Sequence, residues 1–167
     1  MSIKRFFLVV YIVSFTIFSW LVYKEKILEY YEENNYEEIL FELYIPRINL
    51  RKYVYTIDSK KNNVDKNISI LSTSDLNNNL YFIASHSGGG KASYFDTLIF
   101  LDKGDIIWLN NYTFVIEDIF YIEKNGYFDT NYTSNTLFLL TCSIDNKGKQ
   151  LVIKSKLFFI ENDNKKS

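Results

Sequence analysis

One thiol and one imidazole are the residues in this sequence with the clearest chemical potential. The chain has a single cysteine, Cys142, and a single histidine, His86. A cysteine nucleophile needs its thiolate form and a proton carrier for the leaving group, and an adjacent imidazole can supply both. Each residue lies where an apolar run gives way to a polar, glycine-containing segment, in TLFLLTCSIDNKG and LYFIASHSGGG. A catalytic pair at two strand ends is one interpretation of this pattern. The alternative is a buried cysteine and an unrelated surface histidine.

The same scarcity excludes several other kinds of site. One cysteine cannot form an intramolecular disulfide, and one cysteine with one histidine cannot supply a zinc site that needs several such ligands. We therefore expect no metal site of that kind. The expectation that no organic cofactor takes part rests on the family resemblance given below. The 19 basic and 20 acidic residues give a net charge of -1, which argues against a nucleic-acid partner. The Gly88–Lys91 segment is not a phosphate-binding loop, because Ala92 follows where that loop requires Ser or Thr.

Short apolar runs rich in Ile, Val, Tyr and Phe must position these two residues. Clusters of Asn, Asp, Ser and Gly separate the runs, which is typical of an all-β domain. The predicted strands are Leu43–Leu50, Tyr53–Ile57, Ile68–Leu71, Leu80–Ser85, Asp105–Leu109, Tyr112–Tyr121, Thr136–Cys142 and Gln150–Ile160. Asn110–Asn111 is predicted to form a tight hairpin turn, since asparagine tolerates left-handed backbone. About eight strands favour a closed barrel, which removes exposed sheet edges.

The N-terminal 23 residues have the pattern of a membrane anchor. Residues 6–23 carry no charge, and basic residues flank them at Lys4, Arg5 and Lys24. About 20 such residues are needed to cross a bilayer. A cleaved signal peptide is the alternative, but bulky residues at the end of the run disfavour cleavage. We expect a single-pass transmembrane helix over 1–23 with the rest of the chain outside the cell.

Two further segments complete the predicted organisation. Residues 24–42 are acidic, with apolar residues near helical spacing interrupted at Asn34–Asn35, and we interpret them as a short helical stalk of one or two helices. A partner-binding helix is the alternative. Residues 43–167 form the predicted β-barrel domain, with a loop at Gly88–Gly90 that we expect to be mobile beside the site.

From about residue 40 to 160 the chain resembles the sortases, membrane-anchored cysteine transpeptidases of Gram-positive bacteria. LYIPRINL is similar to the opening strand of that family, and FIASHSGGG to the segment that carries its histidine. FDTLIFLDKGDIIWL resembles the family's Phe-x-x-Leu segment followed by Gly-Asp and a hydrophobic strand. TLFLLTC resembles the Thr-Leu-x-Thr-Cys signature, with Thr141–Cys142 in place.

The resemblance implies a fold, a site and a reaction. The fold would be the sortase-like closed barrel. Cys142 would be the nucleophile that forms an acyl-enzyme thioester, and His86 the general acid and base. The substrate would be the sorting-signal peptide of a surface protein, of the Leu-Pro-x-Thr-Gly kind. The acceptor would be an amine of a cell-wall precursor or a pilin, and the location the outer side of the cell membrane.

The sequence departs from the family at the third site position. Sortases carry an arginine just before the last core strand, yet no arginine follows Arg51 here. Aligning QLVI with the family pattern places Gln150 there, and a slip of one residue places Lys149 there. Strand alternation allows only one of the two to face Cys142. Neither has the planar, five-donor head group of arginine.

The missing arginine leaves two further interpretations open. One is a catalytically impaired, sortase-like module that binds peptides without turnover. The other is a purely structural, membrane-anchored barrel in which Cys142 and His86 have no catalytic role.

Overall fold

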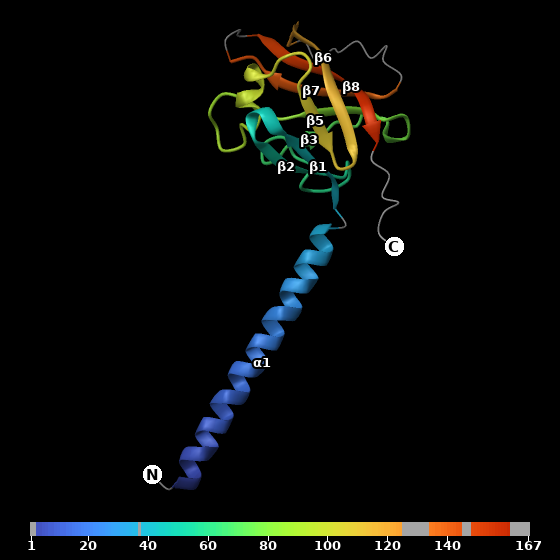
Figure 1. The fold of residues 1–167 in the computed structure, drawn as a ribbon. Helices are drawn as coiled ribbons and strands as arrows, with labels where there is room; N and C mark the ends of the chain where they lie inside the picture. The colour runs from blue at the N-terminus through green and yellow to red at the C-terminus, as the bar shows by residue number, and fades with distance from the viewer. Residues whose placement is uncertain (1–2, 37, 125–133, 145–147, 161–167) are drawn as a thin grey trace. The chain divides into compact units, whose positions relative to one another are not determined.

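The structure is a computed structural model that describes residues 3–36, 38–124, 134–144 and 148–160 (Figure 1). Within the N-terminal helix, side chains are described from residue 11 to residue 28. The chain separates into two compact units, Met1–Glu37 and Glu38–Ser167.

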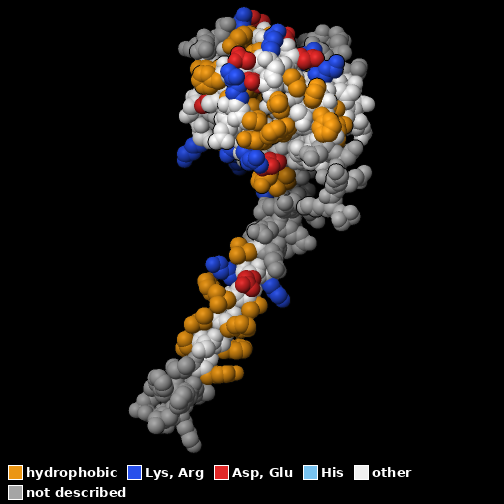
Figure 2. All heavy atoms as spheres, viewed as in Figure 1, with side chains coloured by type: hydrophobic (Ala, Val, Ile, Leu, Met, Phe, Trp, Pro, Cys, Tyr) orange, Lys and Arg blue, Asp and Glu red, His pale blue; other side chains and the backbone are white. Residues whose placement is uncertain are grey.

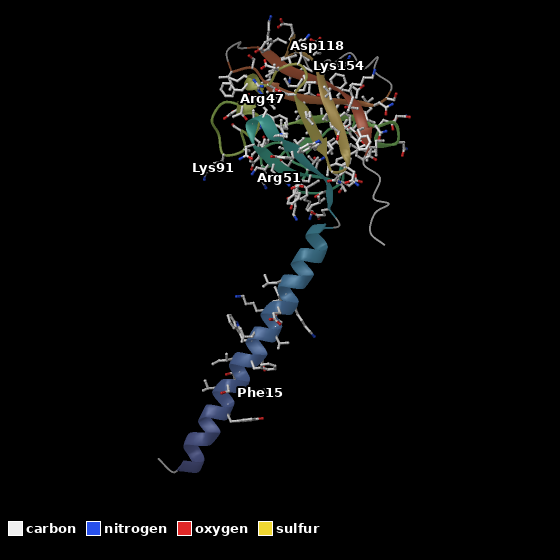
Figure 3. The ribbon with its side chains drawn as sticks, in the orientation of Figure 1. Phe15, Arg47, Arg51, Lys91, Asp118 and Lys154 are labelled. Atoms are coloured by element: carbon white, nitrogen blue, oxygen red, sulfur yellow. The ribbon has the colours of Figure 1, made fainter. Side chains whose placement is uncertain are left out.

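The first unit is a single long helix, α1 (Ile3–Tyr36). The interruption expected at Asn34–Asn35 does not occur, and the helix continues through both residues. Asparagine is only moderately unfavourable within a helix, so a pair of them need not end one. Apolar side chains such as Phe15 and Trp20 are exposed along α1, and charged side chains follow at Lys24 (Figures 2 and 3).

The membrane span predicted over residues 6–23 is not among the elements found. Where side chains are described, no helix combines the length and the apolar character needed to cross a bilayer. Residues 6–10 of the predicted span lie outside that part of the chain. The uncharged stretch that remains, 11–23, is shorter than the about 20 residues that a span requires.

The second unit is built from strands, and eight are found among its described residues. They are β1 (Ile39–Ile45), β2 (Leu50–Tyr55), β3 (Ser69–Ile70), β4 (Leu80–Ala84), β5 (Ile106–Leu109), β6 (Tyr112–Glu123), β7 (Thr136–Cys142) and β8 (Lys149–Ile160). Short 3-10 turns lie at η1 (Pro46–Ile48), η2 (Leu76–Asn78) and η3 (Asp96–Phe100). Each predicted strand has a counterpart, and the all-β prediction for this unit is confirmed.

The strands form one sheet in the order β2-β1-β5-β6-β8-β7-β4-β3. Neighbours are antiparallel except for β4 and β7, which run parallel. The predicted hairpin between β5 and β6 is confirmed, and Asn110 there has a left-handed φ of 48°. The Asn110 side chain also accepts a hydrogen bond from the Glu42 amide at 2.7 Å, which ties the hairpin to β1.

The barrel is nearly closed, which corrects the prediction of a fully closed one. β2 and β3 stand at the two ends of the strand order, and no described ladder joins them. The side chain of Asn62 bridges the gap. Its Oδ1 accepts from the Ile70 amide at 2.9 Å, and its Nδ2 donates to the carbonyl oxygens of Ile70 at 3.0 Å and Ile57 at 3.3 Å. One amide side chain thus takes the place of a strand neighbour for β3.

Two groups of buried side chains lie on opposite faces of the β4–β7–β8 part of the sheet. The inner core includes Leu137 and Leu139 of β7, together with residues from β1, β2 and β5. The alternate residues Phe138 and Leu140 belong to a second cluster, with Phe82 and Val152. This follows from the period of two in a strand, and it places Cys142, the next alternate residue, on the face of the second cluster.

Candidate active site

The parallel pairing of β4 and β7 brings the histidine next to the cysteine. Each paired residue of β4 lies opposite the β7 residue 56 positions later, as Ala84 does opposite Leu140. Continuing that register by two residues places His86 opposite Cys142. Paired residues of parallel strands point to the same side of a sheet, so both side chains lie on one face. The prediction that the two residues meet at neighbouring strand ends agrees with this placement.

Hydrogen bonds keep the two segments together beyond the end of β4. The Ser85 amide donates to the Leu140 carbonyl at 3.2 Å, and the Thr141 hydroxyl donates to the Ser85 carbonyl at 2.9 Å. One step further, the hydroxyl of Ser87 donates to the carbonyl oxygen of Cys142. The residues before and after His86 are therefore both hydrogen-bonded to the Cys142 segment, which fixes the backbone of His86 relative to Cys142.

A second contact holds the histidine segment from behind. The amide of Phe95 donates to the carbonyl oxygen of His86 at 3.2 Å, and the Phe95 side chain is fully buried. His86 is thereby attached to the barrel core through its own backbone. Its imidazole remains partly exposed and available for proton transfer.

Cys142 and His86 line one surface cavity of about 390 Å³. The thiol is free and half-buried, so it can be reached from this cavity. The other residues that line the cavity are Val64, Leu71, Ala84, Ser85, Lys124, Leu140, Thr141 and Gln150. The apolar members form a surface that an aliphatic side chain of a peptide could contact, with the thiol at its edge.

The register of β7 and β8 decides between Gln150 and Lys149. Cys142 pairs directly with Gln150, and Gln150 lines the cavity. Lys149 points to the opposite face, where it pairs with Glu123 and its Nζ lies 3.7 Å from the Glu123 carboxylate. The residue beside the thiol on β8 is therefore a neutral amide, which can donate a hydrogen bond but carries no charge.

An acidic partner of the imidazole was not predicted from the sequence. Asp65 lies between β2 and β3, and its Oδ1 is 3.0 Å from His86 Nε2. The Asp65 side chain is largely exposed, at 77%, and the His86 side chain is about half exposed, at 44%. The contact with Asp65 orients the imidazole and engages Nε2, so Nδ1 is the ring nitrogen that does not contact Asp65. No local pattern marks Asp65, since only the fold brings it to His86.

Lys124 is a second residue that sequence reasoning missed. It follows the last residue of β6 and lines the same cavity as Cys142 and His86. Ile122 pairs with Gln150 across β6 and β8, and Lys124 lies two residues further along. The sequence holds no motif at this point, and only the β6–β8 pairing reveals the position of Lys124.

The glycine loop after His86, which the sequence predicted to be mobile, forms backbone hydrogen bonds with one side chain; its mobility remains a prediction. The Asp96 carboxylate accepts from the amides of Gly88 at 2.7 Å and Gly89 at 3.2 Å. Both glycines have positive φ, at 111° and 80°, which lets the backbone turn its amides toward one side chain. The loop also lines a second hollow with Asp65, His86 and Lys91. Lys91 projects from this loop in Figure 3.

Comparison with known proteins adds a family and a set of similar folds. The model of the sortase domain matches residues 43–158, which is more than half of the chain. No match was found among curated proteins.

Several solved sortase structures resemble this one. Sortase C1 of Streptococcus suis has a TM-score of 0.64 at 18% identity and covers 85% of each chain. Sortase A of Listeria monocytogenes has a TM-score of 0.63 at 18% identity, covering 77% of this chain and 92% of its own. Sortase C-1 of Streptococcus pneumoniae has a TM-score of 0.64 at 20% identity, covering 74% of this chain and 69% of its own. At such identities the likeness establishes a shared fold.

Proposed function

Because the chain belongs to the sortase family, we propose that it is a cysteine transpeptidase with Cys142 as nucleophile and His86 as general acid and base. The supporting observation is the β4–β7 register, which places the two side chains on one face and in one cavity. An accessible thiol beside a fixed imidazole is the arrangement that acyl transfer through a thioester requires.

In the first half of the reaction the enzyme is acylated. The Cys142 thiolate attacks the carbonyl carbon of the scissile peptide bond, and a carbon–sulfur bond forms as the carbonyl electrons move to oxygen. When this intermediate collapses, the carbon–nitrogen bond breaks. The leaving amine takes a proton from the His86 imidazolium, and a thioester on Cys142 remains.

In the second half an acceptor amine attacks the thioester. A new amide bond forms, the proton of the amine passes to His86, and the Cys142 thiolate is released. The proposed donor is a sorting-signal peptide of the Leu-Pro-x-Thr-Gly kind. The proposed acceptor is an amine of a cell-wall precursor or a pilin. Pilin substrate specificity is named for the structurally similar sortase C of Streptococcus pneumoniae.

The proposed location is the outer side of the cell membrane, with residues 6–23 as the anchor. The sequence supports this proposal, since the run has no charge and is flanked by Arg5 and Lys24. Fractionation of cells that express the chain tests it. We expect the chain in the membrane fraction, and Phe15→Lys should release it. Lys26→Gln, which lies beyond the run, is the control. A wild-type chain that is recovered without membrane contradicts the proposed anchor.

Peptide acylation tests the activity. The full chain is incubated with a library of sorting-signal peptides, and intact-mass spectrometry then measures adducts on the protein. We expect an acyl adduct on Cys142 that is absent in Cys142→Ala and strongly reduced in His86→Ala. Lys149→Gln, which changes a residue on the opposite face, should acylate normally. Peptides that bind without forming an adduct would replace the proposal with the catalytically impaired binding module.

A further inference from the structure

The proposed reaction places negative charge in the cavity at two points. The nucleophile is a thiolate, and attack on the peptide carbonyl turns its oxygen into an oxyanion. Fixed positive charge or hydrogen-bond donors near that oxygen usually make the largest single contribution to such catalysis. Gln150 offers a neutral donor, and His86 must exchange its proton during the reaction. Among the described residues that line the cavity, Lys124 is the one side chain with a permanent positive charge at neutral pH.

We infer that Lys124, at the end of β6, supplies the positive charge of the acyl-transfer site and takes the role that the resemblance assigns to an arginine on β8. The inference rests on the function proposed above. The positive charge would then come from β6 and not from the position on β8 beside Cys142.

The sheet register places Lys124 on the face of the thiol. Cys142 pairs with Gln150 across β7 and β8, and Gln150 pairs with Ile122 across β8 and β6. The three side chains therefore form one row on one face. Because side chains alternate, a residue two positions after Ile122 returns to that face, and this residue is Lys124.

The backbone around Lys124 is fixed, and the space beside it is open. The Lys124 amide donates to the Gly148 carbonyl at 2.8 Å, which extends the β6–β8 pairing by one step. Gly148 has no side chain, and a Cβ built on it would contact nothing within 4 Å. The residue opposite Lys124 on this strand end therefore has no side chain that would compete with the lysine for space. A lysine has a long, flexible stem that can extend into this space.

Two acidic residues near the site, among those that the structure describes, contact other side chains. Glu123, the preceding residue, points to the opposite face and contacts Lys149 at 3.7 Å. Asp65 contacts His86 at 3.0 Å. In the described ranges no carboxylate forms an ion pair with Lys124. Its charge is therefore available to an anion in the cavity.

The other lysine near His86 is less suited to this role. Lys91 lies in the glycine loop and lines the second hollow, whereas the cavity that contains Cys142 does not include it among its lining residues. Lys149 is excluded by strand alternation. The geometry therefore selects Lys124 over both.

Alkylation of the single cysteine tests the charge without any peptide substrate. The full chain is treated with iodoacetate, an anion, and separately with iodoacetamide, its neutral analogue. A positive charge near the sulfur favours the anionic reagent. We expect Lys124→Gln to lower the ratio of the two alkylation rates about threefold, the size expected of one partly screened charge several ångströms away. Added salt should reduce the wild-type ratio toward that of the variant.

Three controls make this result specific. Lys149→Gln removes a charge at the opposite face and should leave the ratio unchanged. Lys124→Arg should retain the wild-type ratio. Urea-unfolding midpoints and circular dichroism of each variant confirm that it is folded. A Lys124→Gln ratio equal to wild type, or an equal loss in Lys149→Gln, would overturn the inference.

Peptide acylation then separates this inference from the proposed function. We expect Lys124→Gln to lower the maximal acylation rate about 10²-fold, with less change in KM, and Lys124→Arg to restore most of the loss. If Lys124→Gln is acylated as fast as the wild type, the proposed function stands and the inference about Lys124 is contradicted. If the wild-type chain is never acylated but shows the expected alkylation ratios, the proposed function is contradicted and the positive charge of Lys124 near the thiol stands.

Discussion

At the scale of single residues, the cavity combines a thiol, an imidazole and an amide on three different strands or their ends. Cys142 and Gln150 are direct neighbours across β7 and β8, and both line the cavity, so the amide lies on the side where a group bound at the sulfur would lie. An amide donor is weaker than a charged one, roughly by half. In the proposed reaction, His86 and the charge of Lys124 would therefore have to contribute more to catalysis.

The Asp65–His86 contact leads to a prediction about activity. Asp65→Asn removes the carboxylate that contacts the imidazole and orients it. Asp65 is largely exposed and His86 about half exposed, so solvent screens the interaction and its contribution is small. We expect the acylation rate to fall about two- to fivefold, measured by single-turnover mass spectrometry. Asp58→Asn, an exposed aspartate in the same connection, is the control. A loss as large as that of His86→Ala would show that Asp65 has a more direct role.

The sequence predicted part of the site, and the reason for its limits is physical. Cys142 and His86 are unique in the chain, and each ends an apolar run, so residue type and local pattern identify them. Gln150 and Lys149 are adjacent, and only the pairing of β8 with β7 decides which of them faces the thiol. Lys124 reaches the cavity through long-range pairing, which leaves no mark in the local sequence.

At the scale of secondary structure, the strands were predictable because alternating apolar residues and asparagine-rich turns are local signals. The start of β1 at Ile39 was not predictable in this way. Ile39 and Leu40 follow Tyr36 at helical spacing, so the sequence favoured a helical stalk as far as residue 42. Hydrogen bonding with β2, where Ile39 pairs with Tyr55, makes the segment a strand. Such tertiary pairing overrides a weak local preference.

The gap in the barrel leads to a prediction about stability. Asn62→Ala removes the side chain that bonds the amide and the carbonyl of Ile70. Ile70 is only 2% exposed, so its amide would be left without a partner away from water. We expect a loss of about 1–3 kcal/mol in the free energy of unfolding, measured by urea denaturation.

The matched control for this variant is Asn77→Ala. Asn77 is exposed in η2. Its backbone amide donates a hydrogen bond to the Asp75 side chain, and the substitution retains this amide. The free energy of unfolding of this variant should stay within about 0.5 kcal/mol of wild type. Equal midpoints for the Asn62→Ala and Asn77→Ala variants would contradict the role given to Asn62.

The glycine loop after β4 leads to a prediction about local dynamics. Asp96→Ala removes the acceptor of the Gly88 and Gly89 amides. We expect hydrogen exchange at these two amides to accelerate about tenfold, since each loses a charge-assisted bond. Amide exchange measured by nuclear magnetic resonance checks this. The Gly90 amide donates instead to the Ser93 hydroxyl at 2.8 Å and should keep its rate. Unchanged exchange at Gly88 would show that another contact orders the loop.

At the scale of the whole molecule, one aromatic cluster joins distant parts of the barrel. Tyr81 of β4 packs edge-on against Phe41 of β1 and Phe114 of β6, with ring centroids 5.1 and 5.9 Å apart. Its hydroxyl donates to Asn79 at 3.1 Å. Edge-to-face packing adds to the stabilisation from burial. Because this residue contacts strands that are far apart in the sequence, its ionisation affects the stability of the entire barrel.

That ionisation gives the barrel a defined alkaline limit. Burial, with a smaller contribution from Tyr112, raises the pKa of Tyr81 from 10.0 to about 12. An unfolded chain would ionise this phenol near its ordinary pKa, whereas the folded chain keeps it neutral. The resulting stability is fully present below pH 10 and is lost as the pH rises toward 12. The loss at that limit is about 2–3 kcal/mol for a shift of this size.

Urea unfolding of the wild type and of Tyr81→Phe at pH 8, 10, 11 and 12 measures this effect. The variant lacks the phenol hydroxyl, so it should be less stable at pH 8 by about 1 kcal/mol through the lost bond to Asn79. It should then lose less stability than the wild type above pH 10. Because the wild type's loss of about 2–3 kcal/mol exceeds this initial difference, the two curves should cross at about pH 11. Parallel curves up to pH 12 would show that Tyr81 ionises alike in both states. The alkaline limit would then belong to lysines and to more exposed tyrosines, whose ionisation the substitution leaves intact.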